Sequence, residues 1–100
     1  MKRRFGKEHK AWRAKVIERD KGCIVCGKTH LMNAHHLVPN NFKKYALDVE
    51  NGVILCTHHH VFGAWSAHKN PFWFYEWMLH NRPNQLGIAL SRLMELENDI

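Results

Sequence analysis

The spacing of cysteine and histidine constrains this 100-residue chain more than any other feature. Two Cys-x-x-ligand pairs, Cys23-x-x-Cys26 and Cys56-x-x-His59, lie far apart in the sequence. Zinc in a structural site takes four tetrahedral Cys or His ligands, and each pair can turn two ligand atoms toward one ion. The pattern therefore predicts a structural zinc site formed by both pairs, with His58 as an alternative fourth ligand. Three buried, reduced cysteines without a metal are the competing interpretation.

A second group of polar residues remains once that site is assigned: His35, His36, Asn51 and His60. One of the paired histidines can bind a metal while the other, with an ordinary pKa of about 6.5, acts as a general base. Neighbours on a strand point to opposite faces, so both can serve one site only if the strand distorts before Pro39. Asn51 can fix the base or the loop through its amide, although Asn-Gly is also a turn signal. The other histidines are expected to be ordinary: His9, His30, His68 and His80.

Length and composition limit the class of protein. A chain this short forms one domain with a modest core, and such domains often add a metal. No apolar run approaches the roughly 18 residues of a membrane span, and no signal peptide is expected. Three cysteines cannot all pair with one another, and ligand spacing favours reduced thiols, which predicts a cytosolic protein.

Positive charge is concentrated at the N-terminal end. Residues 1–30 hold 10 of the 15 Lys and Arg residues but only 3 of the 9 acidic ones. A basic segment on a near-neutral body suggests a nucleic acid partner, with a solvated helix face as the competing interpretation. The residues expected to contact a DNA backbone are Arg3, Arg4, Arg13, Lys43 and Lys44.

Hydrophobic periodicity predicts an α+β fold built as strand, loop, strand and helix between flanking helices. The predicted segments are a basic arm at 1–7, a helix at 8–20, a core at 23–67 and C-terminal helices within 71–97. Inside the core, strands are expected at 33–38 and 53–55, and a helix at 57–67. Thr57 is the expected N-cap of that helix, and Val61, Phe62 and Trp65 are expected to face the core.

The C-terminal part is predicted to form two helices. Asn70-Pro71 is a helix start that leads into 71–81, and Arg82-Pro83-Asn84 separates this helix from 84–97. The aromatic stretch 72–78 is interpreted as core. A docking surface of an assembly or adaptor protein is the competing interpretation.

Three segments together resemble the HNH endonuclease family, in particular its members with paired zinc knuckles. They are Cys23-Ile-Val-Cys26, His35-His36-Leu-Val-Pro39 and Asn51-Gly-Val-Ile-Leu-Cys56-Thr-His-His59-His60. The resemblance covers residues 23–60, and the flanking stretches are similar to small HNH proteins of bacteriophages and prophages. It implies a ββα-metal (His-Me finger) core with zinc knuckles, flanked by N-terminal and C-terminal helices.

The resemblance also implies roles for individual residues. His36 aligns with the general base, His35 and His60 with ligands of a catalytic divalent ion, and Asn51 with the central Asn of the motif. His59 stands where the family usually has a fourth knuckle Cys. His35 stands where the family often has Asp. An imidazole is a softer ligand than a carboxylate, so the catalytic ion could be Mg²⁺, Mn²⁺, Ni²⁺ or Zn²⁺.

The implied activity is metal-dependent hydrolysis of phosphodiester bonds in double-stranded DNA. Nicking or cleavage with low sequence specificity, in the cytoplasm of a bacterial host cell, fits the family, and phage packaging proteins are candidate partners. A non-catalytic zinc-binding DNA-binding module is the alternative function. The sequence does not show whether the substrate is DNA or RNA, whether one strand or both are cut, or what the oligomeric state is.

Overall fold

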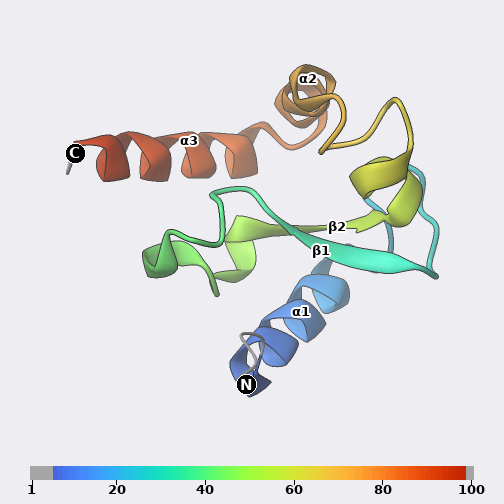
Figure 1. Cartoon of the computed structure of the whole chain (residues 1–100), viewed down its shortest axis with the longest axis horizontal. Helices are drawn as coiled ribbons and strands as arrows, with labels where there is room; N and C mark the ends of the chain where they lie inside the picture. The colour runs from blue at the N-terminus through green and yellow to red at the C-terminus, as the bar shows by residue number, and fades with distance from the viewer. Residues whose placement is uncertain (1–5, 99–100) are drawn as a thin grey trace.

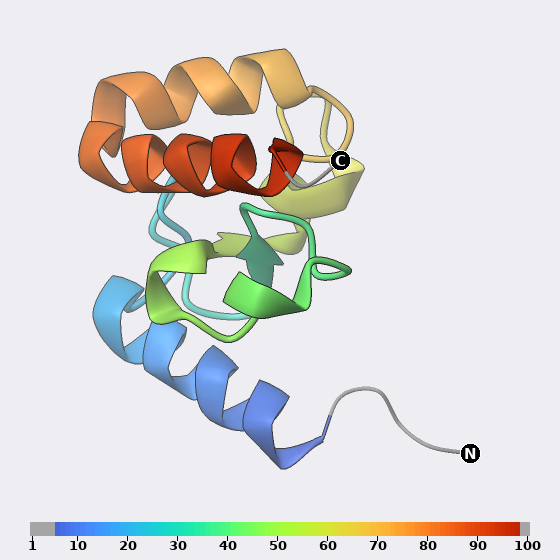
Figure 2. The same ribbon diagram turned by 90° about the vertical axis from the view of Figure 1, so that its left-hand side faces the viewer.

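A computed structural model describes residues 6–98 as a small α+β fold in three layers (Figures 1 and 2). A two-stranded antiparallel sheet lies in the middle. One long helix covers one side of the sheet, and two helices cover the other. The main elements are α1 (Lys7–Asp20), β1 (Met32–His36), β2 (Gly52–Cys56), α2 (Pro71–Asn81) and α3 (Pro83–Glu97). No helix within residues 6–98 is long and apolar enough to cross a membrane.

The register of the sheet positions the two neighbouring histidines of β1. Met32 lies opposite Cys56, His35 opposite Val53 and His36 opposite Gly52. The strand ends at His36, earlier than the expected 33–38. The backbone of Leu37 still donates to the Asn51 carbonyl at 3.0 Å, but the chain then diverges toward Pro39.

One face of the sheet packs on α1. Trp12 and Val16, one helical turn apart, cover Ile54, and all three side chains are buried. Gly52 permits this close approach, because a Cβ atom there would lie 2.5 Å from the Trp12 ring. The helix ends at Lys21, which adopts the left-handed conformation at φ 68°.

The opposite face of the sheet packs on the C-terminal helices. Val53 and Leu55 alternate with Ile54 along β2 and meet Phe74, Met78 and Leu86 in one buried cluster. The two faces of a single five-residue strand thus join all three layers. A domain of this size buries only a modest fraction of its surface on folding. The candidate metal ligands at the end of β2 should therefore contribute more to its stability than they would in a larger protein.

A buried carboxylate also ties the layers together. The side chain of Asp20 at the end of α1 is 0% exposed and pairs with Arg19 at 2.8 Å and Arg82 at 3.1 Å. It also accepts a hydrogen bond from the backbone N–H of Ile54 at 3.0 Å. Burial raises the pKa of the Asp20 carboxyl, but these donors outweigh it and hold that pKa below its ordinary value.

The long connection between the strands contains two short 3₁₀ helices, η1 (Lys43–Tyr45) and η2 (Val49–Asn51). The Trp12 indole N–H donates to the Asp48 carbonyl at 2.7 Å, and the ring nitrogen of this indole thereby anchors the connection to α1. Arg92 of α3 pairs with Asp48 at 3.1 Å from the other side. The connection is therefore held between the first and last helices.

The segment after β2 differs most from expectation. A single π-helical turn, η3 (His58–Phe62), replaces the helix expected over 57–67. Within the described chain Thr57 makes no side-chain capping bond, and Phe62 and Trp65 are 71% and 58% exposed instead of facing the core. The predicted helix start at Asn70-Pro71 is confirmed, since the Asn70 side chain accepts from the Trp73 N–H at 3.2 Å.

Candidate metal centres

The first candidate metal centre joins the knuckle after α1 to the end of β2. The knuckle folds tightly: the Cys23 N–H donates to the Lys28 carbonyl at 2.9 Å, and the Gly27 N–H to the Cys23 carbonyl at 2.8 Å. Gly27 adopts φ 81°, a conformation that glycine tolerates without steric cost. The knuckle reaches β2 through a bond from the Ile24 N–H to the Ile54 carbonyl, which brings its two sulfurs beside Cys56.

The four ligand atoms of this centre fit a zinc ion. Cys26 Sγ lies 3.8 Å from Cys56 Sγ, and His59 Nδ1 lies 3.3 Å from Cys56 Sγ and 3.9 Å from Cys23 Sγ. Around one tetrahedral zinc, two sulfurs lie about 3.8 Å apart, and a sulfur and an imidazole nitrogen about 3.5 Å apart. The Cys₃His group can therefore hold a metal ion such as zinc, with His59 and not His58 as the fourth ligand.

The second candidate centre is a cluster of three imidazoles. Ring nitrogens of His35, His60 and His68 lie within 4.8 Å of one another, and Nε2 of His60 and of His68 are 3.2 Å apart. The expected pair His35 and His60 is brought together across the sheet. His68 was expected to be an ordinary residue, but the structure places it beside these two histidines. Its spacing of eight residues from His60 matches no common metal-ligand spacing.

The surroundings of His35 and His60 lower the pKa of both imidazoles. Burial, followed by the neighbouring histidines His60, His68 and His36, lowers the pKa of His35 to about 3. Burial and then His68 lower the pKa of His60 to about 4. A neutral imidazole is the form that binds a metal, so these two side chains are ready ligands at physiological pH.

His36 faces the other side of the strand from His35 and is held there by two contacts. Its ring stacks on Trp12 with centroids 4.2 Å apart and an interplanar angle of 11°. Its Nε2 lies 2.9 Å from the Ala46 carbonyl. A carbonyl oxygen can only accept, so Nε2 carries the proton and Nδ1 of the neutral ring keeps its lone pair.

The pKa of His36 lies below its ordinary value of 6.5. Burial is the largest cause, the Ala46 carbonyl acts in the opposite sense, and the nearby His9 and Lys43 lower it further. The neutral, proton-accepting form of His36 is therefore favoured. Sequence spacing offers no signal for the contact of Trp12 with a ring 24 positions away.

Asn51 fixes the loop and does not contact the histidines through any bond in the described part of the chain. Its Oδ1 accepts from the Val38 N–H at 2.7 Å, and its Nδ2 donates to the Val38 carbonyl at 3.0 Å. The residue is 1% exposed. Of the two roles considered for this amide, fixing the loop is the one that the structure shows.

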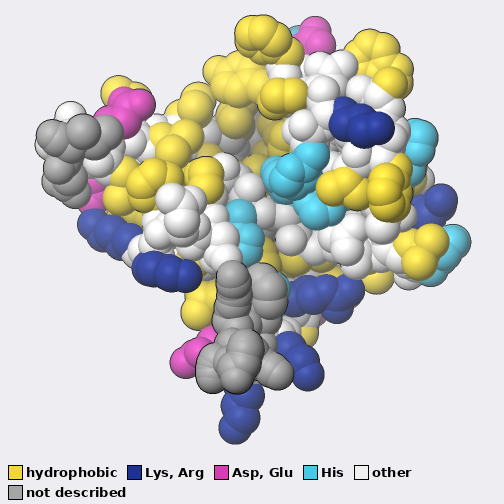
Figure 3. All heavy atoms as spheres, viewed as in Figure 1, with side chains coloured by type: hydrophobic (Ala, Val, Ile, Leu, Met, Phe, Trp, Pro, Cys, Tyr) yellow, Lys and Arg dark blue, Asp and Glu magenta, His cyan; other side chains and the backbone are white. Residues whose placement is uncertain are grey.

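An open cavity of about 520 Å³ borders the second centre and His36 together. Although His35 and His36 point to opposite faces, both line this cavity, as do His60 and His68. On the face shown in Figure 3, several histidine side chains gather near the centre, and Lys and Arg side chains lie around them. A group bound in the cavity can therefore meet the imidazole cluster and His36 at once.

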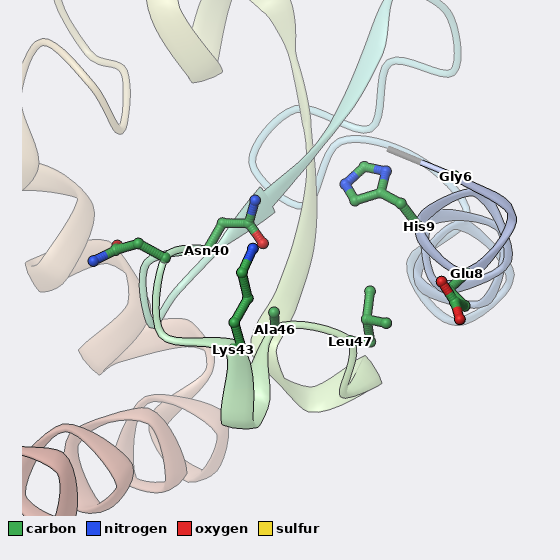
Figure 4. A pocket seen from close by; sticks show the side chains of 8 residues that line it. Gly6, Glu8, His9, Asn40, Lys43, Ala46 and Leu47 are labelled. Atoms are coloured by element: carbon green, nitrogen blue, oxygen red, sulfur yellow. The ribbon is translucent and has the colours of Figure 1, made fainter. Parts of the chain in front are cut away.

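A second cavity of about 530 Å³ continues from the first and shares His9 and Asn40 with it. In Figure 4, His9 extends from α1 toward Asn40 and Lys43 of the loop. The His9 ring centroid lies 5.9 Å from that of His36. His9 was also expected to be an ordinary residue, but it lies at the junction of the two cavities.

The predicted DNA-contacting residues have different surroundings. Lys43 lines the second cavity. Lys44 is paired with Glu95 at 2.6 Å, and Arg13 donates to the Met32 carbonyl at 3.0 Å, so each has a partner within the protein. Arg3 and Arg4 lie outside the described residues.

No protein-family model, curated protein or solved structure matches this chain. The function is therefore inferred from the residues and their geometry.

Proposed function

We propose that this protein is a metal-dependent endonuclease of the HNH type with a ββα-metal core, which hydrolyses phosphodiester bonds in DNA. The observation that carries the proposal is one cavity lined both by His36, whose ring is oriented by Ala46, and by an imidazole cluster that includes His35 and His60. The order β1, β2 and η3, with the Cys₃His group at the end of β2, supports the ββα-metal assignment.

The proposed role of His36 follows from its bonds. With Nε2–H donating to Ala46, Nδ1 is the atom that accepts a proton from water. Water then attacks the phosphorus atom, its proton moves to Nδ1, and the bond from phosphorus to the 3′ oxygen breaks. Trp12 keeps the ring in place by stacking, so the lone pair stays directed at one position.

The second centre supplies the electrostatic part of the proposal. His35 and His60 are the residues that hold a divalent ion, which when bound acts as a Lewis acid toward phosphate oxygens. Lys43 beside the cavity, together with the basic N-terminal segment, supplies sequence-independent attraction for the DNA backbone.

The test is cleavage of supercoiled plasmid with Mg²⁺, Mn²⁺, Ni²⁺ or Zn²⁺ added separately, with single-stranded RNA as a second substrate. His36→Ala is compared with His80→Ala. His80 is an exposed histidine of α2 and does not line the cavity. We expect metal-dependent nicking or cleavage that His36→Ala lowers by about 10²–10⁴-fold and His80→Ala leaves unchanged. Circular dichroism confirms that both variants are folded.

Two results would contradict the proposal. Salt-sensitive plasmid binding without cleavage by any ion would favour a non-catalytic zinc-binding DNA-binding module. Cleavage that His36→Ala does not reduce would place the base elsewhere or indicate a contaminating nuclease.

A further inference from the structure

The position of His68 carries a more specific inference about the second centre. His68 lies in the turn between η3 and α2, outside the segments that resemble the HNH motif. Its ring centroid lies 4.7 Å from that of His60 and 5.1 Å from that of His35. It therefore completes a triangle of imidazoles with one residue from β1, one from η3 and one from the turn.

Backbone hydrogen bonds of the turn hold His68 in this position. The His68 N–H donates to the His60 carbonyl at 3.0 Å, and the Ala67 N–H donates to the His59 carbonyl at 2.8 Å. The turn is closed further by the Asn70 N–H, which donates to the carbonyl of the fully buried Ser66 at 2.8 Å. The pairing of positions 60 and 68 is thus built into the turn.

The separation of the ring nitrogens matches shared coordination. Two nitrogens bound at 2.0–2.1 Å to one tetrahedral zinc lie about 3.3 Å apart. The Nε2 atoms of His60 and His68 are 3.2 Å apart. The same distance also fits a hydrogen bond from one Nε2–H to the other Nε2, and shared metal binding requires both rings to carry their proton on Nδ1.

The chemistry of the site also limits which ion it takes. Of the described residues that line the adjoining cavity, none is acidic. Mg²⁺ requires oxygen ligands in near-octahedral geometry, whereas imidazole suits zinc, copper, iron and nickel. A site with three imidazoles and no carboxylate is therefore a poor site for Mg²⁺.

We propose that His68 is a third protein ligand of the second ion, so that His35, His60 and His68 form an open three-imidazole site selective for zinc-like transition metals over Mg²⁺. The inference rests on the proposed function only in assigning this ion to DNA cleavage. The open side of the site faces the cavity that His36 also lines, so a phosphate oxygen can approach the remaining coordination position.

The experiment measures metal binding by the full chain. Protein that holds one equivalent of zinc by metal analysis, and whose three cysteines are protected from a thiol reagent, is titrated with Co²⁺ and followed by its visible absorption. We expect one further equivalent to bind with the spectrum of a cobalt ion bound by nitrogen ligands, and to resist displacement by a large excess of Mg²⁺. His68→Ala should lower the affinity by at least about 10–100-fold, whereas His80→Ala should leave it unchanged.

His68→Cys gives a positive signal at the same position. A thiolate at position 68 should add a sulfur-to-cobalt charge-transfer band in the near ultraviolet while the zinc stays in the first site. Wild-type affinity in His68→Ala, the absence of that band in His68→Cys, or displacement of Co²⁺ by equimolar Mg²⁺ would each overturn the proposal.

The same variants separate this inference from the nuclease proposal. Three-ligand binding of Co²⁺ without plasmid cleavage under any condition would support the site and reject the nuclease. Cleavage with Mg²⁺ that His68→Ala leaves intact would support the nuclease and reject the third ligand.

Discussion

The two metal centres differ in the number and kind of their ligands, although adjacent residues serve them. The first offers three sulfurs and one imidazole, which are enough to complete a tetrahedral shell around a zinc ion and to leave no position for a substrate. The second offers only imidazoles and borders an open cavity. His59 belongs to the first group and His60 to the second. We therefore expect the first group to stabilise the fold when it holds zinc, and an ion held by the second to stay open to a substrate.

The backbone separates the neighbouring histidines in two different ways. His35 and His36 point to opposite faces because side chains alternate along β1. His59 and His60 diverge because both lie in the helical turn η3, where successive side chains point in different directions around the helix axis. Two pairs of adjacent histidines therefore supply ligands for both centres and a candidate base.

Loss of the first centre should have the largest effect on stability. A chelator that strips zinc, or His59→Ala, should largely unfold the protein, because zinc binding supplies on the order of 10 kcal/mol in small zinc domains. Thermal unfolding with and without chelator measures the effect. His58→Ala is the matched control because His58 is exposed, and we expect it to melt near the wild-type temperature. Equal melting temperatures of the wild-type and His59→Ala proteins would contradict the stabilising role expected of the first centre.

The buried carboxylate at the end of α1 should have the next largest effect. Asp20→Asn leaves Arg19 and Arg82 without their anion and should reduce the free energy of unfolding by about 3 kcal/mol. The native pKa of Asp20 is lowered, so its stabilising effect is complete above the unfolded value of about 3.9 and is lost as pH falls through the native value.

Denaturant unfolding of zinc-loaded wild-type and Asp20→Asn protein tests this sign. The difference in free energy of unfolding between the two proteins should stay constant from about pH 7 to pH 5, because both pH values lie above the pKa of Asp20 in the unfolded chain. A difference that narrows within that range would mean that burial dominates and raises the pKa of Asp20. Glu18→Gln, on the exposed face of α1, is the control.

Asn51 should link stability to the geometry around His36. Asn51→Ala leaves the buried Val38 backbone groups without partners and should cost about 2–3 kcal/mol. The loop also carries Ala46, so the ring of His36 should lose its orientation, and plasmid cleavage should fall while the Cys₃His zinc stays bound. Metal analysis, unfolding and cleavage of one sample test this combination. Wild-type cleavage by Asn51→Ala would show that the loop does not position His36.

The smallest expected effect distinguishes two neighbouring lysines. Lys43 lines the cavity, whereas Lys44 is paired with Glu95. Lys43→Ala should weaken DNA binding uniformly across sequences and reduce the magnitude of the salt-dependence slope by about 1, and Lys44→Ala should change it less. Fluorescence anisotropy at several salt concentrations measures both slopes. Equal slopes would mean that the pair with Glu95 opens when DNA binds.

The parts of the molecule that could be predicted are those set by local spacing. The two Cys-x-x-ligand pairs, the helix start at Asn70-Pro71 and the end of α1 near residue 20 follow from short patterns, whereas the pairing of His35 with His60 was expected from the family resemblance. The prediction of a helix over 57–67 was wrong. The chain makes one π-helical turn, which ends where Gly63 adopts an extended conformation at φ −79° and ψ 160°.

By itself, the sequence indicated the Cys₃His group as candidate metal ligands and a short hairpin with flanking helices. Ligand spacing and hydrophobic periodicity extend over a few residues, so they can be recognised without a structure. Only the tertiary structure decided that His68 joins His35, that Trp12 supports His36, that Asn51 fixes the loop and that Lys44 is paired. Those relations join segments far apart in the chain, and they depend on how three layers pack around a five-residue strand.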